Sequence, residues 1–255
     1  TSTPVQSRQL YSSFVKLFRE SRYSQESILQ ELRYYASIFG AFIYGDAQYS
    51  KQINRLLKRI RILNQTTCYP FLLHIFDDYH NGVIEEKTVE KVLQFILSYL
   101  LRRLVCGVPS NTLRGLFIYL YNRIFKVASN KQKYYETINK FLFTVSSKDA
   151  ILSEAEFERA LQNANIYGNP ALCRFLLLDI ENGDGKEVLQ ADNLTIEHIM
   201  PQTLSADWSH IKPEEHEIYV HTLGNLSVTG YNSELYNKSF LEKKKIISDN
   251  SKAVI

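Results

Sequence analysis

The feature that most constrains the fold is the spacing of apolar residues, which follows the helical repeat from about residue 11 to residue 180 and then stops. Apolar side chains that recur every three or four positions line one buried face of an amphipathic helix. This spacing predicts helices over residues 24–45, 49–63, 69–79, 86–106, 110–125, 131–143, 153–164 and 170–180. We therefore expect residues 1–185 to form a helical domain, a multi-helix bundle.

Polar residues mark where several of these helices should begin. Ser24 or Ser27 is expected to cap the first of them, and Ser110 or Asn111 the helix that runs to about residue 125. Ser153 begins the sequence S-E-A-E, which has the spacing of a capping box. These local signals agree with the apolar spacing, which strengthens the prediction of a mainly α protein.

The character of the chain changes after residues 181–186, where the sequence E-N-G-D-G-K indicates a turn. Residues 195–196 and 223–229 are then expected to form short strands, and residues 233–248 a helix with apolar residues on one side. The predicted second domain, residues 186–255, is thus a small ββα unit that follows the helical domain.

Composition limits the function only weakly. The net charge of +3 is mildly basic, so any surface that binds a polyanion must be local. The three cysteines form no C-x-x-C pair, which argues against a zinc site built from cysteines and favours a reducing, cytoplasmic location. The sequence has no apolar run of about 18 residues, so we expect no membrane span.

The candidate chemistry lies in the last quarter of the chain, around His198. This residue follows the first short strand, and Pro201 should turn the chain outward just after it. A histidine near its ordinary pKa is partly neutral and can take a proton from water. Asn225 follows Gly224 and is expected to open the second strand and to tie the loop that orients His198, although a plain turn asparagine is an equal alternative.

Oxygen ligands for a hard cation occur in the same region. Glu197, Asn232 and Asn237 are candidates to hold Mg²⁺ or Mn²⁺, because carboxylate and amide oxygens suit such ions. Neighbouring strand residues point to opposite faces, so Glu197 and His198 can share one site only if the strand twists or ends between them. For Asn232 the N-cap of the final helix is the favoured role, and Asn237 is expected one turn inside that helix. Lys238 is a candidate phosphate contact, or a solvated side chain.

Three further histidines in this region are possible zinc ligands. His210, His216 and His221 are separated by spacings that fit no common zinc pattern, so we do not expect a zinc site. His221 is still expected near the candidate site, since it precedes the second strand.

Taken as a set, these motifs resemble the HNH, or ββα-metal, nucleases, and in particular the C-terminal nuclease region of GmrSD-type restriction proteins, including phosphorothioate-sensing SspE-like members. The resemblance rests on H-x-x-P at 198–201, G-N-L at 224–226, and N-x-x-x-x-N-K-S-F at 232–240. A second, less specific likeness is the L-x-R-R-x-x-C-G helix end that contains Arg102 and Arg103.

The resemblance implies a metal-dependent endonuclease that cuts or nicks double-stranded DNA in antiviral restriction. It implies that His198 is the general base, Asn225 the residue that orders the loop, and Glu197 with Asn237 or Asn232 the metal side. Arg102 and Arg103 are expected to contact nucleic acid. The family's D-G-Q-Q-R element for nucleotide handling is absent here, so we expect an N-terminal nucleotide-handling domain outside this chain.

A second hypothesis needs no catalysis. The basic helices could instead form a binding module for DNA or for a partner subunit of a larger restriction protein. Basic residues such as Arg55, Lys58 and Arg61 would then contact phosphates, although a solvated helix face is the simpler explanation for any one of them. Metal-dependent cleavage separates this hypothesis from the first.

Overall fold

The computed structural model describes residues 5–20, 22–145, 149–183 and 194–250. The chain divides into two compact units, which are described separately. The first unit comprises Thr1–Leu100 and Ser110–Ile151, and the second comprises Leu101–Pro109 and Leu152–Ile255. The predicted boundary between residues 185 and 186 lies outside the described residues, so that boundary stays a prediction.

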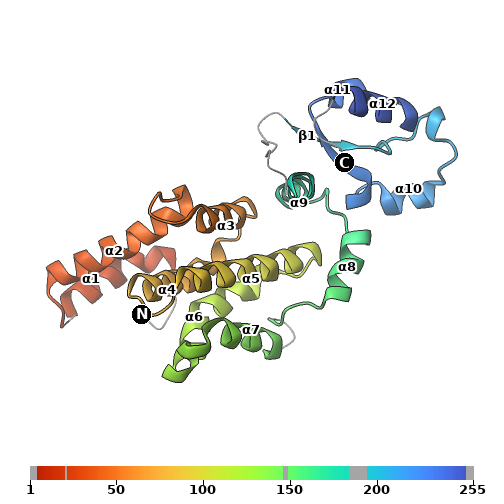
Figure 1. Cartoon of the computed structure of the whole chain (residues 1–255). Coiled ribbons are helices and arrows are strands. Elements are labelled where there is room, and N and C mark those ends of the chain that lie inside the picture. Colours follow the sequence, from red (N-terminus) through yellow and green to blue (C-terminus); the bar gives the residue numbers. More distant parts are fainter. Residues whose placement is uncertain (1–4, 21, 146–148, 184–193, 251–255) are drawn as a thin grey trace. The chain divides into compact units, whose positions relative to one another are not determined.

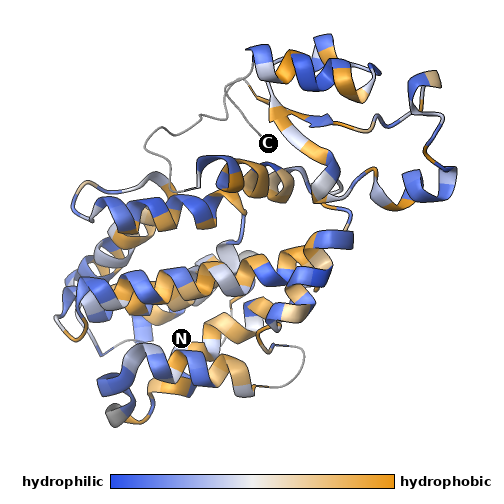
Figure 2. Cartoon of the chain, turned by 45° about the vertical axis from the view of Figure 1, so that its right-hand side comes forward, coloured by the Kyte–Doolittle hydropathy of each residue, from blue (hydrophilic) through white to orange (hydrophobic). Residues whose placement is uncertain are grey.

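The first unit is helical (Figure 1). Its helices are α1 (Leu10–Glu20), α2 (Gln25–Tyr44), α3 (Lys51–Ile62), α4 (Tyr69–His80), α5 (Glu86–Val105, which continues into the second unit), α6 (Leu113–Phe125) and α7 (Tyr134–Thr144). Orange and blue residues alternate along these helices in Figure 2, as expected where one side of each helix is buried. Among the described helices, none is both long and apolar enough to cross a membrane.

The ends of the helices follow the sequence signals in most places. The Ser24 hydroxyl accepts a hydrogen bond from the Ser27 backbone nitrogen at 3.1 Å, so the prediction of Ser24 as a cap is confirmed. The predicted cap at Ser110 or Asn111 is wrong. Residues 110–112 form a 3₁₀ turn, and α6 begins only at Leu113, without a side-chain cap.

The core of the first unit contains one buried carboxylate, Asp78 on α4. Its side chain is only 7% exposed and accepts hydrogen bonds from the hydroxyls of Tyr121 and Tyr134, both at 2.7 Å. The Lys131 ammonium lies 2.8 Å from the other carboxylate oxygen. Because a buried charge is costly without partners, these three donors explain how α4 keeps an aspartate in the core.

The second unit holds the β structure and the C-terminal helices. Its elements are α8 (Glu154–Asn163), α9 (Pro170–Asn182), β1 (Thr195–His198), α10 (Pro213–Tyr219), β2 (Leu226–Thr229), α11 (Asn232–Leu235) and α12 (Phe240–Asn250). The two strands pair antiparallel, with Thr195 opposite Thr229 and His198 opposite Leu226. The prediction of a mainly α chain with a small ββα arrangement near its C-terminus is therefore confirmed.

Ser153 caps α8 with the predicted capping box, in which its side chain and that of Glu156 satisfy each other's backbone nitrogens.

The second strand is shorter than predicted. Residues 223–225 form a 3₁₀ turn, so Asn225 precedes β2 and does not open it.

The single helix predicted over residues 233–248 is wrong. The chain leaves α11 at Tyr236, whose φ of 35° is incompatible with a continuing right-handed helix. A new helix, α12, begins after Ser239. The hydroxyl of Ser239 accepts from the Glu242 backbone nitrogen at 3.4 Å, and the Glu242 carboxylate accepts from the Ser239 nitrogen at 3.1 Å. This second capping box stabilises a separate start for α12.

Candidate functional site

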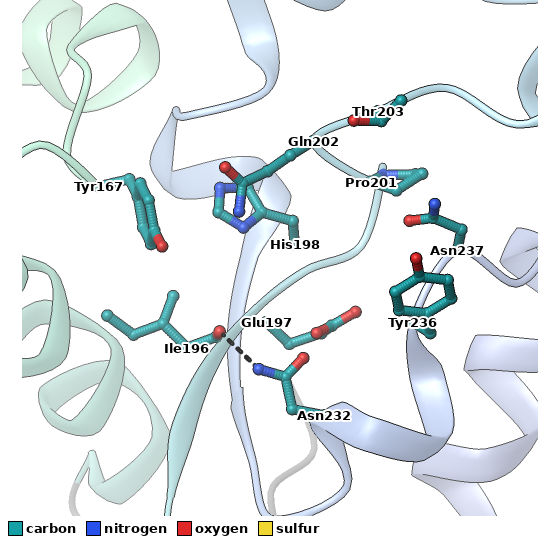
Figure 3. A pocket seen from close by; sticks show the side chains of 10 residues that line it. All are labelled: Tyr167, Ile196, Glu197, His198, Pro201, Gln202, Thr203, Asn232, Tyr236 and Asn237. Atoms are coloured by element: carbon teal, nitrogen blue, oxygen red, sulfur yellow. Dashed lines mark hydrogen bonds between the residues drawn. The ribbon is translucent and has the colours of Figure 1, made fainter.

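A pocket with a volume of about 310 Å³ lies in the second unit, against the end of β1 (Figure 3). It is lined by residues from β1, from the loop after β1, from α11 and from the break before α12, together with one tyrosine from the loop between α8 and α9. These residues are Tyr167, Ile196, Glu197, His198, Pro201, Gln202, Thr203, Asn232, Tyr236 and Asn237.

β1 brings the two candidate residues Glu197 and His198 to this pocket. They are neighbours on the chain, which in a regular strand would send them to opposite faces. The strand ends at His198, however, and both side chains line the same cavity. Both are buried, Glu197 at 4% and His198 at 5% exposure.

The imidazole of His198 is held between two rings. Its Nε2 lies 3.1 Å from Nδ1 of His221, and its ring meets the Tyr167 ring edge-on, with centroids 4.4 Å apart. Burial, together with the neighbouring positive charges of His221, Lys243 and His216, lowers the pKa of His198 to about 4. Near pH 7 the imidazole is therefore neutral and has one nitrogen able to accept a proton.

Glu197 forms an ion pair with Lys243, a residue that was not among the predicted site residues. The Lys243 ammonium, 1% exposed on α12, donates to Oε1 of Glu197 at 2.6 Å and to the backbone oxygen of His198 at 2.7 Å. Burial raises the pKa of the Glu197 carboxyl, whereas the hydrogen bond and charge of Lys243 lower it. We take the carboxyl as ionised near pH 7, because an ammonium lies in direct contact with it.

Asn232 faces Glu197 across the pocket. Its amide nitrogen donates to the backbone oxygen of Ile196 at 3.4 Å, which turns the amide oxygen towards the Glu197 carboxylate (Figure 3). A carboxylate and an amide oxygen are both acceptors, so neither can donate to the other. Two acceptors that point towards each other form a place suited to a cation.

The break between α11 and α12 supplies Asn237 and Lys238. Asn237 lines the pocket, and its backbone oxygen accepts a hydrogen bond from the Ser205 hydroxyl at 3.2 Å. The side chain of Lys238 is exposed, while its backbone oxygen accepts from the Trp208 indole at 3.0 Å. The loop that follows β1 therefore holds the break in place. Asn237 thus lies in this break and not one turn inside a helix.

Asn225 stands outside the pocket and binds the backbone around it. Its side-chain oxygen accepts from the Met200 nitrogen at 2.7 Å, and its amide donates to the oxygens of Met200 and Val220, both at 2.9 Å. These bonds fasten the chain two residues after His198 to the segment before β2. The observed contacts are those of a residue that orders the loop beside His198.

Arg102 and Arg103, expected to contact nucleic acid, are engaged within the second unit. Arg102 donates to the Leu152 oxygen at 3.2 Å and pairs with Glu154 at 3.0 Å. Arg103 is 3% exposed and donates to the Pro109 oxygen at 3.0 Å. Buried in this way, Arg103 cannot reach a phosphate, and we propose no DNA contact for it.

His210, His216 and His221 do not form a zinc site in the described part of the chain. In the part of the chain that the structure describes, there is no group of three or more His, Cys, Asp or Glu side chains placed to hold a metal. His216 contacts the Pro201 oxygen at 2.8 Å, and His221 contacts His198. A hard ion here would therefore rely on few protein oxygens and on water, as Mg²⁺ commonly does.

Sequence reasoning missed Tyr167 and Lys243. Tyr167 lies in a loop that carried no chemical motif, so nothing local pointed to it. Lys243 did leave a signal, because it precedes Ile246 and Ile247 by three and four positions and thus shares their side of α12. A lysine on the apolar side of a helix indicates a buried partner.

Comparison with known proteins supplies one match. Residues 152–255 match the family described as GmrSD restriction endonucleases, C-terminal domain. The matched segment contains every residue of the pocket, so the predicted resemblance is confirmed for this part of the chain. No curated protein and no solved structure matches the chain. Residues 152–255 are thus similar to the C-terminal domain of GmrSD restriction endonucleases.

Proposed function

We propose that the chain is a divalent-metal-dependent DNA endonuclease of HNH type that acts in antiviral restriction, with His198 as the general base. The observation that carries this proposal is the placement of a neutral histidine, a carboxylate and an amide oxygen in one pocket. The match to a restriction endonuclease family supports a nuclease and points to DNA as the substrate.

The pocket fits a hard divalent ion. Glu197 and Asn232 would hold Mg²⁺ or Mn²⁺ through oxygens that face each other, and Asn237 lines the same cavity (Figure 3). When bound, the ion supplies a positive charge that stabilises the charge developing on the phosphate and the leaving oxygen. The Lys243 ammonium keeps the carboxylate ionised and fixes it at the pocket wall.

His198 activates the attacking water in this mechanism. Its Nε2 is engaged by His221, so Nδ1 is the nitrogen that takes the proton as the water oxygen attacks phosphorus. The bond between phosphorus and the 3′ oxygen breaks, and that oxygen takes a proton from solvent. The products carry a 5′-phosphate and a 3′-hydroxyl. General bases of this kind contribute about 10²- to 10⁴-fold to rate.

The surface around the pocket supplies a candidate phosphate contact. Lys238 is exposed and adjoins Asn237, which lines the cavity. Its ammonium would meet the backbone of double-stranded DNA next to the cleaved bond. Contacts of this kind add affinity without sequence preference and weaken as salt is added.

The decisive experiment compares the wild-type chain with His198→Ala on supercoiled plasmid DNA in Mg²⁺ or Mn²⁺. We expect nicked or linear product from the wild type and a loss of at least about 100-fold for the variant. His210→Ala is the matched control, because His210 is exposed in the same unit and lies outside the pocket. Full cleavage by a folded His198→Ala protein would remove the histidine from the mechanism.

A second candidate function is favoured by the exposed face of α3. Lys51, Arg55 and Lys58 recur every three or four positions on that face, and all three are exposed. The helix contains no acidic residue. The first unit would then bind DNA or a partner without cutting it. DNA affinity that falls steeply with salt, in a protein without metal-dependent cleavage, would favour this candidate.

Three further expectations stay proposals, two from the resemblance and the last from the cysteines. They are an N-terminal nucleotide-handling domain outside this chain, the sensing of DNA phosphorothioate, and a cytoplasmic location.

A further inference from the structure

The closest polar neighbour of the His198 ring is another histidine, and no motif predicted its role. Nε2 of His198 and Nδ1 of His221 lie 3.1 Å apart. Two neutral imidazoles at this distance share one hydrogen, so one of the rings donates and the other accepts. Nε2 of His198 is engaged whichever ring donates, so the direction of this bond decides whether Nδ1 of His198 carries a hydrogen.

We infer that His221 is a positioning residue, which accepts a hydrogen bond from Nε2–H of His198 and so leaves Nδ1 of His198 unprotonated. This inference rests on the proposed function of His198 as the base. The chemistry of the reaction supports the direction of the bond. After His198 takes a proton from water, both of its nitrogens carry hydrogen, so its neighbour must then be an acceptor. A donor at Nδ1 of His221 would oppose that state.

The structure holds the His221 ring rigidly enough for this task. The Tyr167 ring stacks on it, with centroids 5.2 Å apart and an angle of 10° between the planes. The backbone nitrogens of Ile166 and Tyr167 donate to the backbone oxygen of His221 at 3.0 and 3.3 Å. The loop between α8 and α9 therefore fixes both the backbone and the ring of His221 beside His198.

This arrangement assigns a role to Tyr167 as well. Its ring stacks on His221 and meets His198 edge-on, so it limits the rotation of both imidazoles. It also lines the pocket. Tyr167 thus links the segment before the strands to the proposed catalytic base.

The test uses the full chain and two variants of His221. His221→Phe keeps a flat ring against Tyr167 and removes the acceptor nitrogen. His221→Asn removes the ring but places an amide oxygen near the position of Nδ1. We expect kcat to fall about 10- to 100-fold in His221→Phe with little change in KM, as for other residues that orient a reactive group. His221→Asn should recover part of this loss. His210→Phe, an identical change at an exposed site in the same unit, should leave kcat unchanged.

A second measurement does not depend on cleavage. ¹⁵N NMR of histidine-labelled protein distinguishes a protonated from an unprotonated ring nitrogen. We expect His198 to be protonated at Nε2 in the wild type and to become a mixture of the two neutral forms in His221→Phe. His198 protonated at Nδ1 in the wild type, or full kcat in folded His221→Phe, would overturn the inference.

The two proposals fail in different ways. If His198→Ala abolishes cleavage while His221→Phe stays fully active, the proposed function stands and the role of His221 is wrong. If folded His198→Ala cleaves normally, the proposed function fails, and the NMR spectra still report the direction of the bond between the two histidines.

Discussion

Among the residues that the structure describes, two buried carboxylates each contact a lysine, Asp78 in the first unit and Glu197 in the second. Asp78 accepts from two tyrosine hydroxyls and from Lys131. Among the described residues, Glu197 accepts from Lys243 on Oε1. Donors thus reach both oxygens of Asp78, whereas Oε2 of Glu197 is left for the pocket.

This difference separates a structural charge from a functional one. A buried carboxylate that serves only the fold is expected to have donors at both of its oxygens. A carboxylate that must bind a cation has to keep acceptor capacity open, at a cost in stability that its lysine partly offsets. Asp78 fits the first description, and Glu197 fits the second, because it faces the amide oxygen of Asn232.

Removing Lys243 should have the largest effect on stability. In Lys243→Met, Glu197 stays buried without its cation, and breaking a buried pair in this way costs about 3–5 kcal/mol. Urea denaturation measures the change in the free energy of unfolding. The double variant Glu197→Gln, Lys243→Met should recover most of the loss, since it removes the unpaired charge.

Recovery of stability in the double variant would show that Lys243 stabilises the fold mainly by neutralising Glu197. A cost below about 1 kcal/mol for Lys243→Met would show that the pair is not needed to keep Glu197 buried.

Removing the charge of Asp78 should destabilise the first unit without changing the rate of DNA cleavage by the folded protein. Asp78→Asn weakens hydrogen bonds from two tyrosines and an ion pair with Lys131, and we expect a loss of about 2–3 kcal/mol. Cleavage per folded molecule should stay at the wild-type rate. Asp77→Asn is the matched control, at a less buried neighbour on α4. Loss of cleavage in folded Asp78→Asn would contradict a purely structural role.

Glu197→Gln should show the opposite behaviour. The glutamine oxygen is expected to face Lys243, which turns the NH₂ group into the pocket where a cation would bind. We expect Mn²⁺ affinity and cleavage to fall about 10- to 100-fold. Mn²⁺ binding followed by electron paramagnetic resonance tests this without relying on activity. Unchanged Mn²⁺ affinity in Glu197→Gln would place the metal elsewhere.

The sequence predicted the helices between residues 24 and 180 well because amphipathic spacing is a local signal. Each helix from residue 24 to residue 180 shows its buried side in its own residues, and the structure has helices at the expected places. The division of the predicted helix 233–248 into α11 and α12 was harder to predict from the sequence. Tyr236 adopts a positive φ without being glycine, although the S-F-L-E sequence at 239–242 did carry the signal of a new cap.

The pocket was predictable only in part. Glu197, His198, Asn232 and Asn237 were expected together, and all four line it. Tyr167 and Lys243 reach the site from positions distant in sequence, through ring stacking and a buried ion pair. Such contacts depend on how whole elements pack, so no local pattern records them. Arg103 is the opposite case. Its charge suggested a contact with nucleic acid, but the side chain is buried and donates to the Pro109 oxygen.

The smallest predicted effect is a pH dependence of stability that comes from His74 on α4. The His74 ring stacks on Tyr121, whose hydroxyl donates to Asp78. Burial lowers the pKa of His74, and Lys131 lowers it as well, whereas Asp77 and Asp78 raise it. Below its ordinary pKa near ~6.5, the unfolded chain binds a proton that the folded chain binds less readily, so acidification destabilises the fold. From pH 6.5 to 5.5 this contribution should be below about 1 kcal/mol. His74→Phe keeps the stacking on Tyr121 and should remove this pH-dependent contribution. Urea unfolding curves of the wild type and the variant, measured at both pH values, would detect the difference. An unchanged pH dependence in His74→Phe would instead assign the acid sensitivity of the first unit to groups other than this ring.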